Sequence, residues 1–282
     1  MGTEESDDFV VQLLRENRRL KTELNRREGI ASSRWWRLHP RLNAERLLTA
    51  LRGPREPPPV APSMLPREQT VPPPVPSDLV GRFRREVIGH GTFSHDWFTG
   101  HIPSWEPMMR ALEGRTARVL EIGAFEGLST CFVLWRLPDA TVTAVDTFAG
   151  SAEQVARDLL PNGSLEHVFD ANVAHVDGTR ARKLVGDSKR VVLDLHAEHA
   201  RFDFVYVDGS HLALDVLIDA ALSWSLLTLE GFLVFDDYGW SAVGPDPLLR
   251  PGPAIDAFLE LVDGKYEVVS KGTQLALRKT SA

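Results

Sequence analysis

The chain has 282 residues, of which 43% are hydrophobic, and carries a net charge of −7. This is enough for one domain of about 200 residues with its own core plus further segments, and the acidic balance gives no reason to expect nucleic-acid binding. A single cysteine, Cys131, excludes an internal disulfide, and the sequence shows neither a signal peptide nor an apolar run of the ~18 residues that span a membrane, so we expect a cytoplasmic protein.

Residues 1–52 are predicted to form a helical segment. In residues 9–28, apolar side chains follow heptad spacing, and Asn17 occupies a position in the same seam. The apolar positions are Val10, Leu13, Leu20 and Leu24. A buried Asn in such a seam favours a parallel dimer, so the segment predicts a coiled coil and a homodimer or higher homo-oligomer. A solvated amphipathic helix is the alternative, because so short a coil is marginal alone.

The same segment is basic. Residues 9–52 hold eleven Lys/Arg against four Glu, and Trp35 and Trp36 stand among the arginines. Such a patch can contact an anionic membrane surface, which would make the protein peripheral at the inner face of the membrane. The alternative is that both tryptophans pack on the folded domain.

A proline-rich linker is predicted at residues 53–79. Residues 53–77 contain ten of the 19 prolines, a composition typical of an extended or disordered spacer. The folded domain is therefore expected at residues 80–282.

Strands and helices alternate through this domain. Apolar, strand-like runs are predicted at 117–123, 141–148, 182–188, 202–209, 231–238, 265–270 and 273–279. Helices are predicted at 127–137, 151–160, 188–200, 211–227 and 253–261. The pattern predicts an α/β fold with a doubly wound, Rossmann-like, mostly parallel seven-stranded sheet that ends in an antiparallel hairpin. Ligands bind such sheets beyond the carboxyl ends of the strands.

The first strand ends in EIGAFEG, where Gly123 and Gly127 allow a ligand to approach the backbone. Asp146 ends the second strand, about 20 residues on, where a carboxylate can accept both hydroxyls of a ribose. The G-x-G-x-x-G pattern of dinucleotide folds is missing, and Glu121 would repel phosphate but suits a cationic amino-acid group. These residues favour S-adenosylmethionine (SAM) over NAD as the cofactor.

Further cofactor contacts are expected along the same edge of the sheet. In the GDS run, Asp187 can accept a hydrogen bond from an adenine amino group, with Ser188 assisting. We also expect Ser129 and Asp208 to contact the cofactor. The ordered runs EIGAFEG, VDTF, GDS, VDGSH and FDDY resemble class I SAM-dependent methyltransferases. The resemblance implies an enzyme of the methyltransferase class.

Three carboxylates, Asp208, Asp236 and Asp237, follow the strands at 202–209 and 231–238. Methyl transfer from SAM does not need them, and like charges so close repel each other. A divalent cation, Mg²⁺ or Mn²⁺, removes the repulsion and can activate a hydroxyl. His211, expected at the start of a helix that would lower its pKa, is the candidate general base.

The domain resembles more specifically the metal-dependent sugar O-methyltransferases of the macrocin and mycinamicin type, over residues 90–279. In that family the acids matching Asp208, Asp236 and Asp237 bind Mg²⁺, and some members use as base a histidine that matches His211. Other members use an Asp where this chain has Ser210. The resemblance implies SAM- and metal-dependent methylation of a hydroxyl on a sugar, glycoside or glycan, with glycan biosynthesis as the setting.

Substrate contacts are expected from several polar and aromatic residues. Residues 92–109 precede the first strand, where such enzymes place a lid, and aromatic rings there can stack on a sugar face. The candidates are His95, Asp96, Trp97, His101, Trp105, Asn172 (in a loop), Tyr238 and Trp240. A hydrophobic cap is the alternative for the first group. Two other functions stay open: methylation of a catechol or other phenol, and a non-catalytic scaffold that acts through the coil and linker.

Overall fold

The structure is a computed structural model, and it describes residues 78–151, 154–155, 158–161, 163–240 and 246–282. The chain divides into two units, residues 1–71 with 152–158 and residues 72–151 with 159–282. The second unit is described here by itself. The predicted coiled coil, the basic segment with Trp35 and Trp36, and nearly all of the proline-rich linker lie outside the described residues, so these remain predictions.

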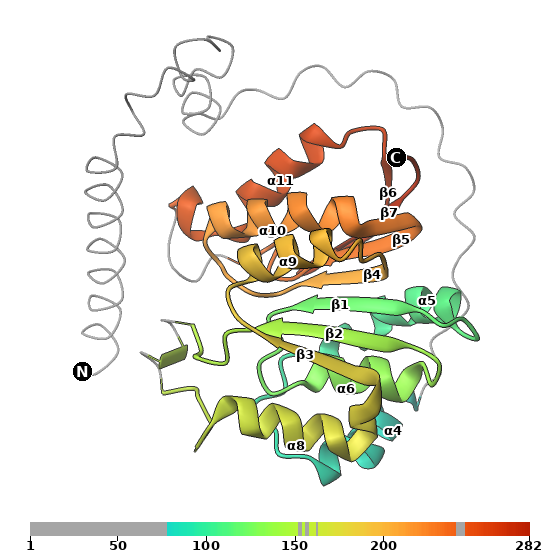
Figure 1. Cartoon of the computed structure of the whole chain (residues 1–282), viewed down its shortest axis with the longest axis vertical. Coiled ribbons are helices and arrows are strands. Elements are labelled where there is room, and N and C mark those ends of the chain that lie inside the picture. The colour runs from blue at the N-terminus through green and yellow to red at the C-terminus, as the bar shows by residue number, and fades with distance from the viewer. Residues whose placement is uncertain (1–77, 152–153, 156–157, 162, 241–245) are drawn as a thin grey trace. The chain divides into compact units, whose positions relative to one another are not determined.

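The second unit is built on a seven-stranded sheet with the strand order β3-β2-β1-β4-β5-β7-β6 (Figure 1). The strands are β1 (Arg118–Ile122), β2 (Thr141–Asp146), β3 (Ala181–Val185), β4 (Phe202–Val207), β5 (Leu227–Phe235), β6 (Tyr266–Lys271) and β7 (Leu275–Lys279). The first five run parallel, and β7 pairs antiparallel with both β5 and β6. The predicted fold, including the closing antiparallel pair, is confirmed.

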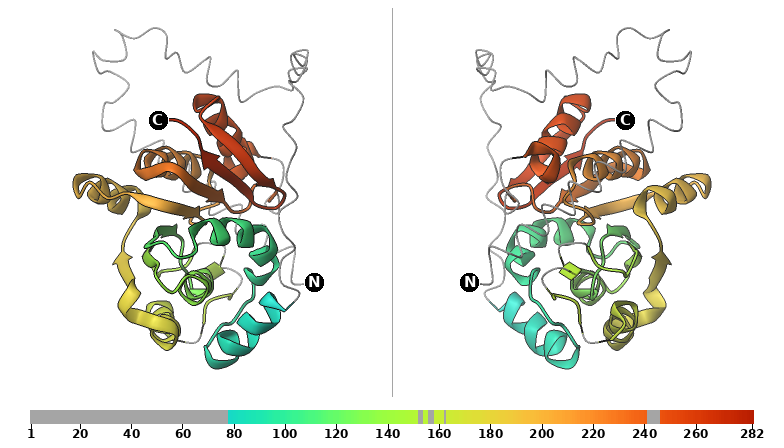
Figure 2. Two further views of the ribbon diagram at one scale, coloured as in Figure 1. Left: turned by 90° about the vertical axis from the view of Figure 1, so that its right-hand side faces the viewer. Right: turned by 90° about the vertical axis from the view of Figure 1, so that its left-hand side faces the viewer.

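Helices cover both faces of the sheet. They are α4 (Leu79–Glu86), α5 (Ile102–Leu112), α6 (Leu128–Arg136), α8 (Leu165–Asp177), α9 (Ser188–Ala197), α10 (Ala213–Leu226) and α11 (Pro251–Leu261). Short 3-10 turns stand at Ile88–His90, Thr99–His101, Gly178–Arg180 and Pro247–Leu249. The first four helices pack on one face and α9, α10 and α11 on the other, as Figures 1 and 2 show.

The central strands are apolar on both faces because each face is buried. In β4, Phe204 and Tyr206 pack toward the side of α5 and α6, whereas Val205 and Val207 pack toward α10. All four side chains are almost completely buried. This two-sided burial explains why parallel strands read as continuous apolar runs rather than as alternating ones.

Some helices differ from the sequence-based expectation. The helix α8 was not predicted, although Leu165, Phe169 and Val173 follow a helical spacing and Ser164 caps its first turn. Of the predicted helix at 151–160, residues 152–153 and 156–157 lie outside the described residues; residues 154–155 are helical, and 158–160 are not. Residues 102–109, expected to belong to a lid, lie in the helix α5, whose Trp105 is buried in the core.

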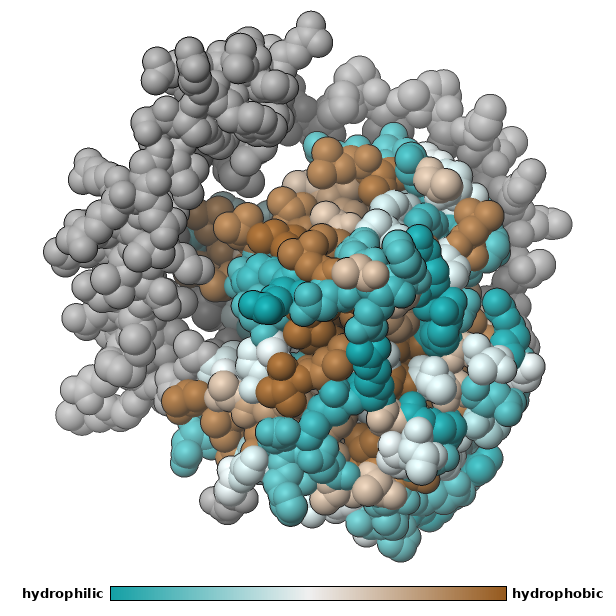
Figure 3. All heavy atoms as spheres, in the orientation of Figure 1, coloured by the Kyte–Doolittle hydropathy of each residue, from teal (hydrophilic) through white to brown (hydrophobic). Residues whose placement is uncertain are grey.

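The surface in Figure 3 mixes hydrophilic and hydrophobic residues, with hydrophobic side chains gathered over the helices of the α9–α11 face. Exposed large apolar residues on these helices include Leu193, Leu214 and Leu261. In the described part of the chain, no helix is both long and apolar enough to cross a membrane.

Candidate functional site

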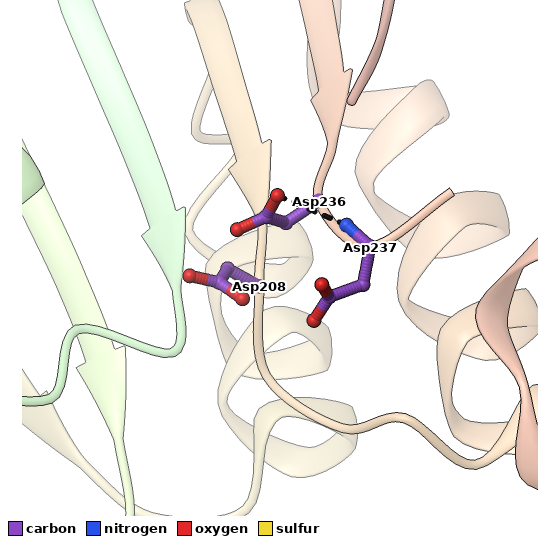
Figure 4. A group of neighbouring side chains, drawn as sticks. All are labelled: Asp208, Asp236 and Asp237. Carbon is purple, nitrogen blue, oxygen red and sulfur yellow. Dashed lines mark hydrogen bonds between the residues drawn. The ribbon is translucent and has the colours of Figure 1, made fainter. Parts of the chain in front are cut away.

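The candidate site lies at the carboxyl ends of β4 and β5, which are neighbours in the sheet. Asp208 follows β4 directly, and Asp236 and Asp237 follow β5. The register pairs Val207 with Phe235, so both strands end at the same level. Parallel strands in such a register bring their terminal side chains together, and Figure 4 shows the three carboxylates pointing toward one another.

The three carboxylates are close enough to bind one ion. One oxygen from each lies within 4.8 Å of the others. Burial, followed by the charges of Asp236 and Asp237, raises the pKa of Asp208 well above its ordinary value. A hard divalent cation prefers carboxylate oxygens and would offset this repulsion. The donor set therefore fits the Mg²⁺ or Mn²⁺ that the sequence predicts.

His211 lies beside this cluster, but not at the start of a helix. The helix α10 begins at Ala213 with Leu212 as its N-cap, so His211 lies in the preceding loop, outside the first turn. Because a helix dipole acts mainly on its first turn, that part of the expectation is wrong. Instead, Nε2 of His211 is 2.8 Å from Oδ2 of Asp237, and its ring lies 4.2 Å from the Trp240 ring.

The residues expected to hold the cofactor form the neighbouring part of the same edge. Gly123 follows β1 with a φ of +90°, and a Cβ there would lie 2.0 Å from the carbonyl oxygen of Asp208. No side chain fits at that position, so the glycine lets the loops after β1 and β4 meet. Gly127 also has a positive φ, +82°, and precedes the first residue of α6. Gly123 thus serves the close approach of two backbone segments, whereas a Cβ at Gly127 would meet the side chains of Phe169 and Val173 on α8.

Asp146 and Glu121 are held by the protein itself. Oδ2 of Asp146 accepts a hydrogen bond from the amide of Phe125, and Oδ1 accepts one from the amide of Phe148. Asp146 therefore fixes the loop after β1 to the loop after β2. The two carboxylate oxygens of Glu121 accept hydrogen bonds from the hydroxyls of Ser129 and Thr130 on α6. Glu121 and Ser129, both expected to contact the cofactor, therefore lie together and are hydrogen-bonded to each other.

Burial raises the pKa of Glu121 to about 7, and this predicts a pH-dependent stability. The folded-state pKa lies above the ordinary 4.5, so the contribution of Glu121 to stability is greatest below pH 4.5 and falls as the pH rises from there through about 7. The fall amounts to roughly 3 kcal/mol. Glu121→Gln is expected to remove this fall and to be more stable than the wild type at pH 8. Urea denaturation of both proteins at pH 5 and pH 8 measures the free energy of unfolding. Identical pH dependence of the two proteins would contradict the raised pKa of Glu121.

The GDS residues lie at the start of α9. Asp187 is exposed and caps this helix, because its side chain accepts from the amide of Lys189. Ser188 donates from Oγ to Oδ1 of Asp219 at 2.8 Å. Asp219, on α10, is 1% exposed, and burial raises its pKa to about 6. The sequence did not single out Asp219, a buried acid next to the expected cofactor residues.

The segment before α5 contacts the loop between Gly123 and Gly127. The rings of His95 and Trp97 stack at 4.5 Å, and Trp97 lies 5.3 Å from the ring of Phe125 in that loop. Glu126, 1% exposed, accepts from both the amide and the hydroxyl of Ser94. The segment is thus anchored over the loop after β1, with Trp97 49% exposed beside it.

Asn172 has a different environment from the one expected. It lies in α8, is 2% exposed, and the expectation of a loop position is wrong. Its Oδ1 accepts from the amide of Thr92, and its Nδ2 donates to the carbonyls of Thr92 and Glu126. These hydrogen bonds tie α8 to both the segment before α5 and the loop after β1.

Replacing Asn172 by alanine is expected to destabilise the fold. The change leaves one amide and two carbonyls without their partner, and each buried unpaired group costs about 1–3 kcal/mol. We expect a loss of about 3 kcal/mol in the free energy of unfolding, measured by urea denaturation. His167→Ala, at an exposed position of the same helix, is the matched control. An equal effect of both changes would show that Asn172 has no special role.

Four other substrate candidates point elsewhere or cap local structure. The Tyr238 hydroxyl donates to Asp256 on α11 at 2.7 Å. Asp96 accepts from both the amide and the hydroxyl of Thr99. Trp105 is 1% exposed in the core. His101 ends the turn before α5, and its carbonyl accepts from the hydroxyl of Ser104.

Residues 120–238 match the sequence model of a family described as a methyltransferase domain. No curated protein matches the chain. Among solved structures, the chain is similar to the MycE methyltransferase from the mycinamycin biosynthetic pathway in complex with Mg, SAH and mycinamycin VI. The TM-score is 0.52 and the identity 17%, over 72% of this chain and 54% of that chain. The chain therefore spans about half the length of MycE.

A second similar structure comes from Klebsiella pneumoniae, a protein proposed to be an O-methyltransferase. The TM-score is 0.51 and the identity 17%, over 74% of this chain and 92% of that chain. At such identities the two likenesses show a shared fold, and residues 120–238 are similar to the matched methyltransferase domain.

Proposed function

We propose that the chain, whose residues 120–238 match a methyltransferase domain, is a SAM-dependent enzyme that methylates a hydroxyl of a sugar or glycoside with the help of a divalent cation. One observation carries the proposal. The carboxylates of Asp208, Asp236 and Asp237 converge at the strand ends, and His211 contacts one of them. The sugar acceptor is supported by the likeness to MycE, whose structure holds mycinamycin VI.

The three carboxylates would hold the cation. When bound, it would act as a Lewis acid that lowers the pKa of an acceptor hydroxyl and fixes its direction. Asp236 is already oriented for this, because its Oδ1 accepts from the amide of Asp237 at 2.9 Å.

His211 would take the proton. A carboxylate accepts hydrogen bonds but does not donate them, so Nε2 of a neutral His211 carries the hydrogen that faces Asp237. The lone pair of the ring then lies on Nδ1, which accepts the proton of the acceptor hydroxyl. Asp237 would stabilise the imidazolium that forms. The acceptor oxygen bonds to the methyl carbon of SAM as the bond from that carbon to sulfur breaks, and S-adenosylhomocysteine (SAH) leaves.

Positioning supplies the rest of the rate, because SAM is already a reactive methyl donor. The stacked rings of His95 and Trp97 lie beside the loop after β1, and we propose that they contact the acceptor. An aromatic ring with an exposed face can stack against the apolar face of a sugar. Trp240, in contact with His211, is placed to do the same beside the base.

Transfer of a labelled methyl group from SAM to a panel of glycosides and catechols, with and without a chelator, tests the proposal. We expect label in a glycoside, loss of label with EDTA and recovery on adding Mg²⁺. Label in catechols alone would show that the acceptor is a phenol and not a sugar. Transfer that persists in EDTA would show that no cation is needed. Failure to bind SAM at all would favour a non-catalytic scaffold.

A further inference from the structure

We propose that the buried hydroxyl of Tyr206 holds the carboxylates of Asp208 and Asp236 in the arrangement that binds the cation. Tyr206 is then a positioning residue that does not itself touch the acceptor or the cofactor. The inference rests on the metal-dependent function proposed above. It concerns two acids that follow different strands, Asp208 after β4 and Asp236 after β5.

One hydroxyl contacts both acids. The Tyr206 oxygen lies 2.7 Å from Oδ2 of Asp236 and 3.0 Å from Oδ2 of Asp208. Tyr206 lies on β4 and is 2% exposed, so water does not compete for its hydroxyl. Because a phenol has a single proton to donate, the two carboxylates share it. This contact ties the acid after β4 to the acid after β5.

A buried chain of hydrogen bonds sets the direction of that proton. The indole Nε1 of Trp105 can only donate, and it donates to Oε1 of Gln274 at 2.9 Å. The amide nitrogen of Gln274 is therefore turned toward Tyr206, whose oxygen accepts from it at 3.3 Å. The proton of Tyr206 must then point at the carboxylates. Trp105 and Gln274 are 1% and 4% exposed, respectively.

Asp208 and Asp237 each have one oxygen held by a donor, and Asp236 has both oxygens held. Tyr206 is the donor for Asp208, Tyr206 and the amide of Asp237 are the donors for Asp236, and His211 is the donor for Asp237. Held in this way, the carboxylates lose less rotational freedom when a cation binds. Residues that orient metal ligands typically contribute 10- to 100-fold to metal affinity.

The alternative role for Tyr206 is a core aromatic ring whose hydroxyl merely needs a buried partner. The two roles predict different results for Tyr206→Phe, which keeps the ring and removes the hydroxyl. If Tyr206 serves packing alone, the change lowers stability and leaves cation affinity unchanged. If it positions the acids, cation affinity falls.

The test is Mn²⁺ binding to the full-length protein, measured by electron paramagnetic resonance of the unbound ion. For Tyr206→Phe we expect affinity about 10- to 100-fold below that of the wild type, with SAH affinity unchanged. Saturating Mn²⁺ should restore most of the rate, which a damaged fold would not allow. Gln274→Leu should weaken binding in the same direction but less.

Tyr266→Phe is the matched control, since it removes the same hydroxyl elsewhere. Phe235, next to the acids at the end of β5, pairs with Leu275 at the start of β7. Tyr266 pairs with Lys279 at the other end of β7, away from the acids. The Tyr266→Phe variant should bind Mn²⁺ with the same affinity as the wild type. Wild-type affinity in both Tyr206→Phe and Gln274→Leu overturns the proposal while leaving the function intact. A wild-type protein that binds no Mn²⁺ overturns the metal-dependent function first, and the role of Tyr206 with it.

Discussion

Asp236→Asn is expected to weaken Mn²⁺ binding by more than about 100-fold and to abolish methyl transfer at physiological Mg²⁺. The change removes one of three charged ligands. Metal affinity should therefore fall by more than the 10- to 100-fold typical of residues that only orient a ligand. Metal titration by calorimetry and the methyl-transfer assay measure the two effects.

The same substitution should raise stability in the absence of metal. The charge of Asp236 helps to raise the pKa of Asp208, so removing that charge relieves repulsion between half-buried acids. A higher melting temperature without metal, combined with lost metal binding, distinguishes a ligand from a structural residue. Asp194→Asn, the same change at an exposed position of α9, is the control. Undiminished metal affinity in Asp236→Asn would rule out the proposed cation site.

His211→Ala is expected to lower kcat by about 10²- to 10⁴-fold, the usual contribution of a general base. Nε2 of His211 contacts Asp237, which would hold the ring in place and stabilise its charged form. Affinity for SAH should change little, because the ring is proposed to act on the acceptor's proton. Mn²⁺ affinity should fall by at most about 100-fold, because the ring also orients the carboxylate of Asp237. Single-turnover methyl transfer at saturating SAM and Mg²⁺ isolates this step.

His167→Gln, at an exposed position of α8, controls for the loss of an imidazole as such. A kcat of His211→Ala within the range of this control would exclude His211 as the base. The acceptor hydroxyl would then have to lose its proton to solvent or to another group.

The acidic cluster was predictable from the sequence because of where parallel strands end. Apolar runs that end in Asp208 and in Asp236–Asp237 identify two buried strands, and their carboxyl ends meet at one edge when the strands are neighbours. Strand order cannot be read from the runs themselves. It follows here from the α/β alternation and from the family resemblance.

The exact environment of each side chain was not predictable. Asn172 was expected in a loop, whereas it lies in α8 and its partners lie 80 and 46 residues away in the chain. The role of Gln274 depends on Trp105, 169 residues before it. Such contacts exist only after the sheet has formed, and no local spacing encodes them.

Glu121 and Asp146 show the same limit in another form. Their positions at strand ends were predicted, but the hydroxyls and amides that occupy their oxygens come from α6 and from two loops. Their cofactor contacts are predicted from the strand-end positions and from the chemistry of a carboxylate, and no local spacing indicates the internal donors. Their cofactor contacts remain predictions.

Calorimetric titration of the full-length protein with SAH at fixed Mg²⁺ tests most directly whether this edge of the sheet is a SAM site. Binding at one site per chain with micromolar affinity is the predicted result, and it would justify the search for a glycoside acceptor. No detectable binding would contradict the enzymatic function and leave the N-terminal segment and the linker as the parts to study.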